Sequence, residues 1–153
     1  MSTASPRPLG PWLLGLSGLI PFIGCVVLVF AAPPPFNTVA ETAFISYGAV
    51  ILSFLGGARW GAELVRGGDR PSTGRLAAAV FPSVIGWFAV TLLYAGAPIA
   101  LGMILVAGVA QLFWDLAAAR SGLLPAWTAP LRITLTVVAM GCCAVLLAHV
   151  LTR

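Results

Sequence analysis

Long uncharged apolar runs restrict the folds that this sequence can adopt. The charged residues are clustered, and they leave five apolar runs of roughly 20 residues, the length of helix that crosses the hydrocarbon core of a bilayer. Charged residues make up only 8% of the 153 residues, whereas a soluble domain carries about 25%. The sequence therefore predicts one all-α integral membrane domain, a bundle of five transmembrane helices.

The five predicted spans are separated by segments that end helices. The proline run Pro33–Pro35 ends the first span, because proline has no N–H to donate. A polar loop rich in turn-forming residues, 66–75, follows the second span. Only Tyr94–Pro98 joins the third and fourth, which should form a tight antiparallel hairpin. We place the spans at residues 11–31, 40–62, 76–95, 99–119 and 131–151.

The first span has two interpretations. Val29-Phe30-Ala31 resembles the small-residue cleavage site of a signal peptide. However, the apolar region of a signal peptide has about 7–15 residues, and this run is longer and has Pro21 in its middle. We therefore expect a retained helix, in which neighbouring helices satisfy the carbonyl group that the proline leaves free.

The basic residues, all arginines, are distributed unevenly between the two sides of the predicted bundle. Five spans place the N-terminus and the second and fourth loops on one side of the membrane. The other side holds only one basic residue, Arg153. The positive-inside rule then predicts a cytoplasmic N-terminus in a bacterial inner membrane, or a matrix-facing one in a mitochondrial inner membrane. Seven of the eight basic residues fall on the N-terminal side: Arg7, Arg59, Arg66, Arg70, Arg75, Arg120 and Arg132.

Composition and motifs argue against several classes of function. The arginines lie at helix ends and in loops, so no nucleic-acid binding is expected. Three cysteines in apolar runs and the single His149 offer no metal-ligand spacing and no pair of haem ligands. Glu41 lies at the start of the second span, where the helix dipole favours a negatively charged carboxylate, so we expect it to cap the helix. No phosphate loop or metalloprotease motif occurs, and we predict no catalytic residue, metal or cofactor.

The second span carries a ridge of small residues at intervals of four: Ala49, Ser53, Gly57 and Gly61. Residues at this spacing lie on one helix face, and Gly57 and Gly61 form a GxxxG motif. Such a face lets two helix backbones approach closely in a membrane. The ridge predicts tight helix packing, either within the chain or against a partner.

Two charged residues, Arg59 and Asp115, lie at least three residues inside the ends of predicted spans. Asp115 is four or five residues from the end of the fourth span, a depth at which an unpaired carboxylate costs several kcal/mol. Arg59 lies at a similar depth in the second span, so we predict an ion pair between them. We expect Gln111, Glu63 and Arg132 nearby. The layer is either a helix-locking ion pair or a pocket for an anionic or polar ligand or a proton.

One stretch resembles a known family. The sequence YGAVILSFLGG, followed after two residues by Trp60-Gly61, is similar to the domain of unknown function 3429 family, small multi-pass inner-membrane proteins that include transmembrane protein 69-like members. Leu131-Arg132 and Leu135-Thr136 resemble its second signature. The resemblance implies a multi-helix inner-membrane protein and no assigned reaction. Its motif residues here are Tyr47, Gly56, Gly57, Trp60 and Gly61.

Three functions remain open. The leading hypothesis is a non-enzymatic accessory, assembly or scaffold component, whose partners are the lipid bilayer and other inner-membrane subunits or a second copy. The first alternative is a small transporter or channel-like protein that uses the polar layer. The weaker alternative is a membrane enzyme acting on a lipid or quinone.

Overall fold

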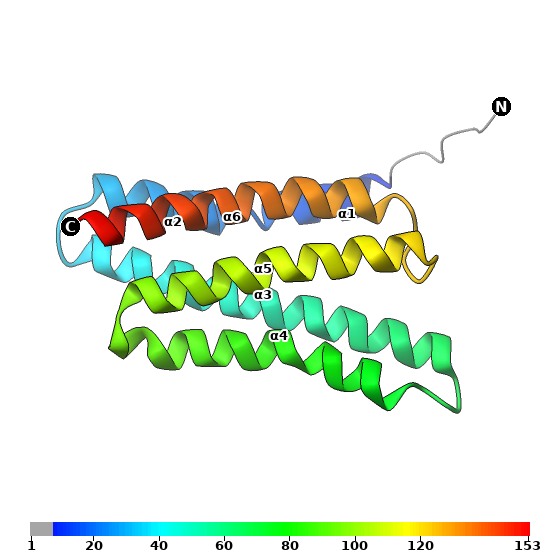
Figure 1. Cartoon of the computed structure of the whole chain (residues 1–153). Coiled ribbons are helices and arrows are strands. Elements are labelled where there is room, and N and C mark those ends of the chain that lie inside the picture. Colours follow the sequence, from blue (N-terminus) through cyan, green and yellow to red (C-terminus); the bar gives the residue numbers. More distant parts are fainter. Residues whose placement is uncertain (1–7) are drawn as a thin grey trace.

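The computed structural model describes residues 8–153, which form a helical bundle without any strand in that range (Figure 1). Five helical stretches are long and apolar enough to cross a membrane, so the all-α, five-span prediction is confirmed. Arg7, one of the arginines counted above, lies outside the described residues. The elements are α1 (Leu9–Ser17), α2 (Ile20–Ala31), α3 (Phe36–Gly67), α4 (Thr73–Thr91), the 3₁₀ turn η1 (Leu92–Ala95), α5 (Ala97–Arg120) and α6 (Thr128–Thr152).

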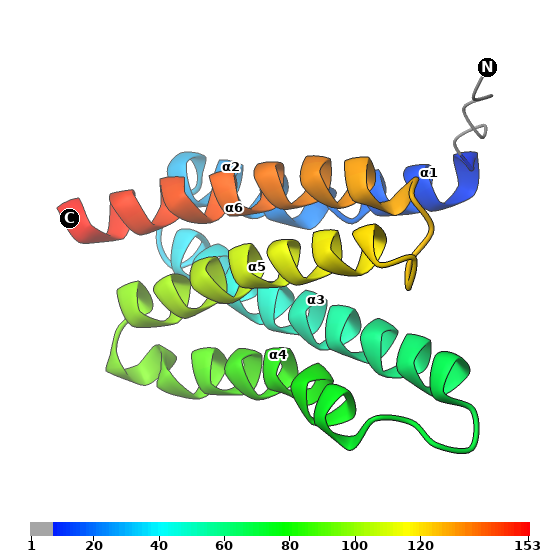
Figure 2. The ribbon, with the colours of Figure 1, turned by 45° about the vertical axis from the view of Figure 1, so that its right-hand side comes forward.

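The spans alternate in direction, and they pack in three layers. The first layer holds α6 with α1 and α2, the middle layer holds α3 and α5, and α4 lies on the far side of the middle layer (Figures 1 and 2). The loops after α3 and after α5 lie at one end of the bundle, and the C-terminus lies at the other (Figure 1). We call the first the arginine-rich end, because Arg66, Arg70, Arg75 and Arg120 lie in or beside its loops. Its cytoplasmic orientation stays a prediction.

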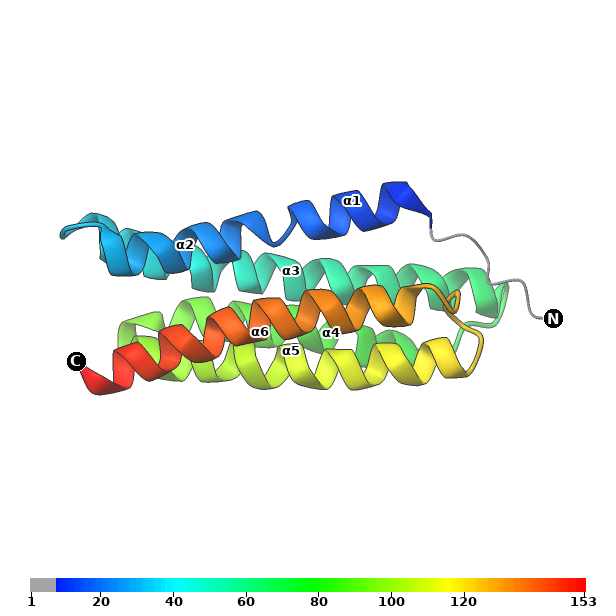
Figure 3. The ribbon, with the colours of Figure 1, turned by 90° about the horizontal axis from the view of Figure 1, so that it is seen from above.

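The first span is two helices rather than one. It breaks at Gly18 and Leu19, and Pro21 lies in the first turn of α2. Proline has no N–H for the carbonyl of the residue four positions earlier, and its ring clashes with that carbonyl. The Tyr47 hydroxyl of α3 donates a 3.0 Å hydrogen bond to the Gly18 carbonyl at the break. Figure 3 shows the change of direction between α1 and α2.

Helices α3 and α4 approach each other closely at two glycines. A Cβ atom on Gly56 would lie 2.4 Å from the Ala79 carbonyl oxygen, and one on Gly86 would lie 3.0 Å from the Ala49 backbone. A side chain at Gly56 would therefore force the two helices to shift, and one at Gly86 would be tighter than most real contacts. Of the predicted ridge, Ala49 alone is used in this contact. The neighbouring face of α3 meets α4 instead, and Ser53, Gly57 and Gly61 are exposed on the described structure.

The helices extend beyond the predicted spans, most of all in α3. This helix has 32 residues and begins at Phe36, directly after the proline run. Glu41 is therefore not in the first turn, and the predicted capping role is wrong. Instead, Glu41 is buried, and its carboxylate accepts a hydrogen bond from Arg153 Nη2 at the end of α6. This contact ties the C-terminal end of the chain to α3.

Candidate polar site

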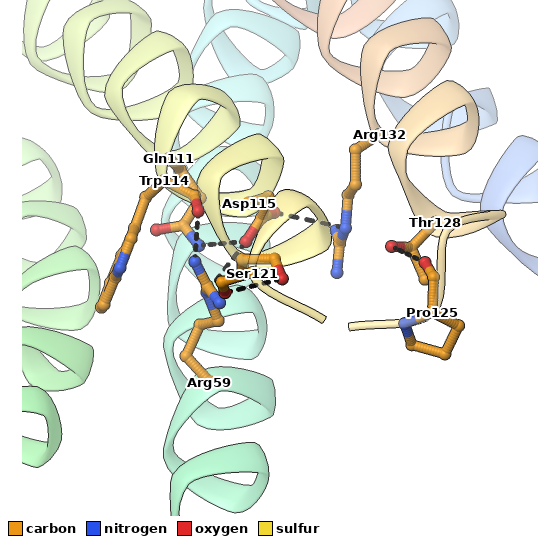
Figure 4. A network of polar contacts seen from close by, with 9 residues as sticks. Arg59, Gln111, Trp114, Asp115, Ser121, Pro125, Thr128 and Arg132 are labelled. Atoms are coloured by element: carbon orange, nitrogen blue, oxygen red, sulfur yellow. Dashed lines mark hydrogen bonds and ion pairs between the residues drawn. The ribbon is translucent and has the colours of Figure 1, made fainter. Parts of the chain in front are cut away.

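Three helices bring charged side chains together near the arginine-rich end. Arg59 comes from α3, Gln111 and Asp115 come from α5 one turn apart, and Arg132 comes from the first turns of α6 (Figure 4). We call these four residues the polar cluster. Gln111 and Asp115 share a face because residues four apart are neighbours on a helix.

Asp115 is the centre of the polar cluster. Its side chain is 3% exposed, and both of its oxygens have partners. Oδ1 lies 3.1 Å from Arg59 Nε and accepts a 3.2 Å hydrogen bond from Gln111 Nε2. Oδ2 lies 3.3 Å from Arg132 Nε. The carboxylate thus joins α5 to both α3 and α6; the contact with Arg59 is the predicted ion pair, and Arg132, expected only nearby, is a second partner.

Arg59 points into the bundle and away from water. Its side chain is 4% exposed. Nη2 donates to the backbone carbonyl of Trp114, and the guanidinium carbon lies 4.6 Å from the centre of the Trp114 ring. A guanidinium group over an indole face is stabilised by the ring quadrupole. Trp114 therefore belongs to the site, although nothing in the sequence marks it except its position next to Asp115.

The polar cluster carries more positive than negative charge. Two guanidinium groups, Arg59 and Arg132, share the single carboxylate of Asp115, which leaves a net charge of +1 by that count. Charges interact strongly where water is scarce, so an unbalanced cation there favours an anion nearby. Arg132 is the more accessible of the two, with 23% of its side chain exposed.

Glu63 is not part of the polar cluster. Its Oε1 accepts a 3.0 Å hydrogen bond from the Ser72 backbone N–H, and its Oε2 accepts a 3.3 Å bond from Arg75 Nη1. Glu63 therefore holds the loop between α3 and α4. It still lies close to Arg59, because both residues line one cleft of about 350 Å³ at the arginine-rich end, together with Arg66 and Arg75.

The described part of the chain, residues 8–153, contains no group of three or more His, Cys, Asp or Glu side chains placed to hold a metal ion. Cys143 is buried in the core, where its thiol donates to the Leu101 carbonyl at 3.4 Å. His149 packs its ring against Phe30, with 4.6 Å between the ring centres. These groups act as packing residues in the bundle.

The fold and the site define a class: a multi-pass helical membrane protein with a charged cluster enclosed by three of its spans near one end. The chain belongs to the family described as "Protein of unknown function (DUF3429)", which matches residues 7–148. It is also similar to transmembrane protein 69 of Xenopus tropicalis, with 37% identity over 137 residues. That match covers 89% of this chain and 52% of the relative, so the chain spans about half of the relative's length. No solved structure matches it.

The structure gives some family motif residues a packing role and leaves others on the surface. Tyr47 bonds the break in the first span, and Gly56 makes the close contact with α4. Trp60 is 39% exposed. Among the described residues 8–153, a Cβ atom added to Gly57 or Gly61 would meet nothing within 4 Å beyond the backbone of its own helix. The family motif therefore has residues on two faces of α3: Tyr47 and Gly56 face the bundle, and Gly57, Trp60 and Gly61 face outward.

Proposed function

We propose that this protein is a non-enzymatic accessory or scaffold component of a bacterial inner membrane, or of the mitochondrial inner membrane in a eukaryote. The observation that carries the proposal is the outer face of α3, formed by Ser53, Gly57 and Gly61. These residues are exposed, and a Cβ atom added to either glycine would meet nothing within 4 Å.

The outer face of α3 has the pattern that membrane helices use to pack against each other. Its small residues are four positions apart, so a second backbone can approach along them. The chain uses other glycines, Gly56 and Gly86, for its own close helix contacts. Without a partner, Gly57 in this apolar helix offers bilayer lipid little side-chain contact. A helix from another inner-membrane subunit fits this face, and so does α3 of a second copy.

The test is the composition of the particle that the tagged full chain forms in mild detergent. We expect a stoichiometric partner subunit or a homo-oligomer, and we expect the double variant Gly57→Leu/Gly61→Leu to release it. Gly141→Leu is the matched control, because Gly141 is exposed on α6 and also has open space around it. Purification of the wild type as a lone monomer would contradict the proposal.

A second candidate function is supported by the polar cluster. Its net charge of +1 and the partly exposed Arg132 favour a role in holding an anionic or polar ligand, as in a small transporter or channel-like protein. The corresponding test is ligand-dependent stabilisation of the purified protein, which should weaken in Arg132→Gln, because this variant removes the more accessible cation. No stabilisation of the wild type by any anion tried would count against this candidate.

A further inference from the structure

An apolar cavity of about 160 Å³ lies next to the polar cluster. Residues from α1, α2, α3, α5 and α6 line it, and Arg132 is its one charged lining residue. It is about the size of an engineered 150 Å³ cavity that binds benzene, so it has room for several carbon atoms of a hydrocarbon chain. The lining includes Gly15, Leu19, Leu52, Ile104, Leu135 and Met140.

The lining residues of α6 change from charged to apolar along the helix. Arg132 is followed by Leu135 and Thr136, and then by Ala139 and Met140, all on one face. From Arg132 to Met140 the helix rises about 12 Å at 1.5 Å per residue. Because Arg132 lies in the first turns of α6, the charged end is near the membrane boundary and the apolar part reaches toward the bilayer centre. This is the polarity profile of a lipid in one leaflet.

α1 is the least enclosed wall of this cavity. It has no buried residue, and Leu14, which lines the cavity, is 76% exposed. Gly15 of α1 and Gly18 directly after it carry no side chain. The α1 side is therefore the side from which a hydrocarbon chain would enter the cavity.

We propose that the cavity binds part of one acyl chain of an anionic phospholipid from the surrounding bilayer, with the lipid phosphate at Arg132. The net charge of the polar cluster favours an anionic headgroup over a zwitterionic one. Arg132 uses its Nε for Asp115, and Figure 4 shows the end of its guanidinium extending beyond this contact. Guanidinium N–H groups match phosphate oxygens in charge and geometry. The inference rests on the second candidate function and gives it a ligand class, and it is independent of the scaffold proposal.

The first experiment compares lipids on the purified full chain. Phosphatidylglycerol and phosphatidylcholine with identical acyl chains are added in detergent, and binding is measured by native mass spectrometry. We expect tighter binding of phosphatidylglycerol, which supports the inference. Glycerol phosphate tests the headgroup alone. Equal binding of the two lipids, or equally tight binding of glycerol phosphate, would overturn the inference. Since no partner protein is needed, failure here is distinct from failure of the scaffold proposal.

Two matched pairs of variants locate the lipid. Arg132→Gln should weaken phosphatidylglycerol binding about tenfold, as expected for the loss of one charge-assisted contact. Arg120→Gln makes the same charge change at the same end without lining the cavity, and it should bind like the wild type. Thr136→Phe should fill the cavity and weaken both lipids, whereas Val137→Phe, at a 63% exposed position on α6, should not. Equal effects within either pair would overturn the inference.

A measurement on the wild type covers the case in which a variant fails to fold. Phosphatidylglycerol with a photoreactive group in its acyl chain is cross-linked to the protein, and the modified peptides are identified. We expect modification of the cavity wall at residues 48–55 and 135–140. Cross-links found only on helix faces outside the cavity would overturn the inference.

Discussion

Asp115 has three nitrogen partners on three different residues, and together they enclose it almost completely. A carboxylate at this depth depends on those partners, because the surrounding lipid and apolar side chains provide none. The partners depend on Asp115 in turn. Without its charge, Arg59 and Arg132 would be two like charges held close together near the membrane boundary.

Asp115→Asn should therefore destabilise the protein strongly. Removing one member of a buried ion pair costs ~3 kcal/mol or more, which corresponds to a fall of about 10 °C in the midpoint of thermal unfolding. The measurement is thermal unfolding of the detergent-purified protein by circular dichroism. Asp69→Asn is the control, because Asp69 is an exposed acid in the loop after α3. Equal midpoints for Asp115→Asn and the wild type would show that the polar cluster does not stabilise the fold.

The sequence predicts part of this site and misses another part for a clear reason. The depths of Arg59 and Asp115 in their spans are enough to predict that they pair, since each needs a partner in the membrane. Trp114 contributes a backbone carbonyl, which every residue has, and its indole ring meets Arg59 only because the fold brings α3 beside α5. Glu63 is one turn from Arg59 on the same helix, but the chain after α3 turns back, and Ser72 of the loop and Arg75 of α4 become its partners.

At the scale of the elements, α3 has two faces made of adjacent glycines with opposite surroundings. Gly56 faces the Ala79 carbonyl of α4, and Gly57, one residue later, faces outward. The two positions therefore offer a comparison in which the sequence context is nearly identical and only the neighbour differs.

We expect opposite effects from alanine at these two glycines. Gly57→Ala should raise stability by up to ~1 kcal/mol, because alanine favours a helix over glycine and the added methyl group has open space. Gly56→Ala should lower it by about 1–3 kcal/mol, the usual range for overpacking, because the helices must move apart. Thermal unfolding of both variants measures the difference. A loss of stability in Gly57→Ala comparable to that in Gly56→Ala would mean that the outer face of α3 is packed within the chain.

The two element-scale differences from the sequence prediction also have physical causes. A four-residue repeat of small side chains identifies a helix face but not the neighbour that it meets, and the face one residue away meets α4 instead. Pro21 indicates a weak point in the first span. The sequence does not show whether such a helix bends or breaks, because that depends on partners from other helices, such as Tyr47, which bonds the Gly18 carbonyl at the break.

On the scale of the whole molecule, the bilayer makes the sequence easy to interpret. Each span needs about 20 apolar residues, so the number of spans follows from the sequence alone. Which helices lie next to each other does not follow from the sequence, because apolar side chains are found both on lipid-facing surfaces and between helices. Leu14 and Phe54, for example, line the cavity although they are 76% and 65% exposed.

The orientation of the whole molecule can be tested with single cysteines at its two ends. Tyr94 is fully exposed at the end opposite the arginine-rich loops, and Asp69 is exposed in one of those loops. In intact bacterial cells made permeable only at the outer membrane, a membrane-impermeant maleimide should label Tyr94→Cys and not Asp69→Cys. The wild type, whose three cysteines lie inside the spans, gives the background. The reverse pattern would contradict the positive-inside prediction.

The ion pairs also predict which positions the chain can vary. It has four acidic residues in all, and three of them connect α3 to a different helix. Glu41 bonds Arg153 at the end of α6, Glu63 bonds Arg75 of α4, and Asp115 of α5 bonds Arg59. In a library of all single substitutions, these three acids should therefore be among the least replaceable positions, while Asp69 should accept almost any residue.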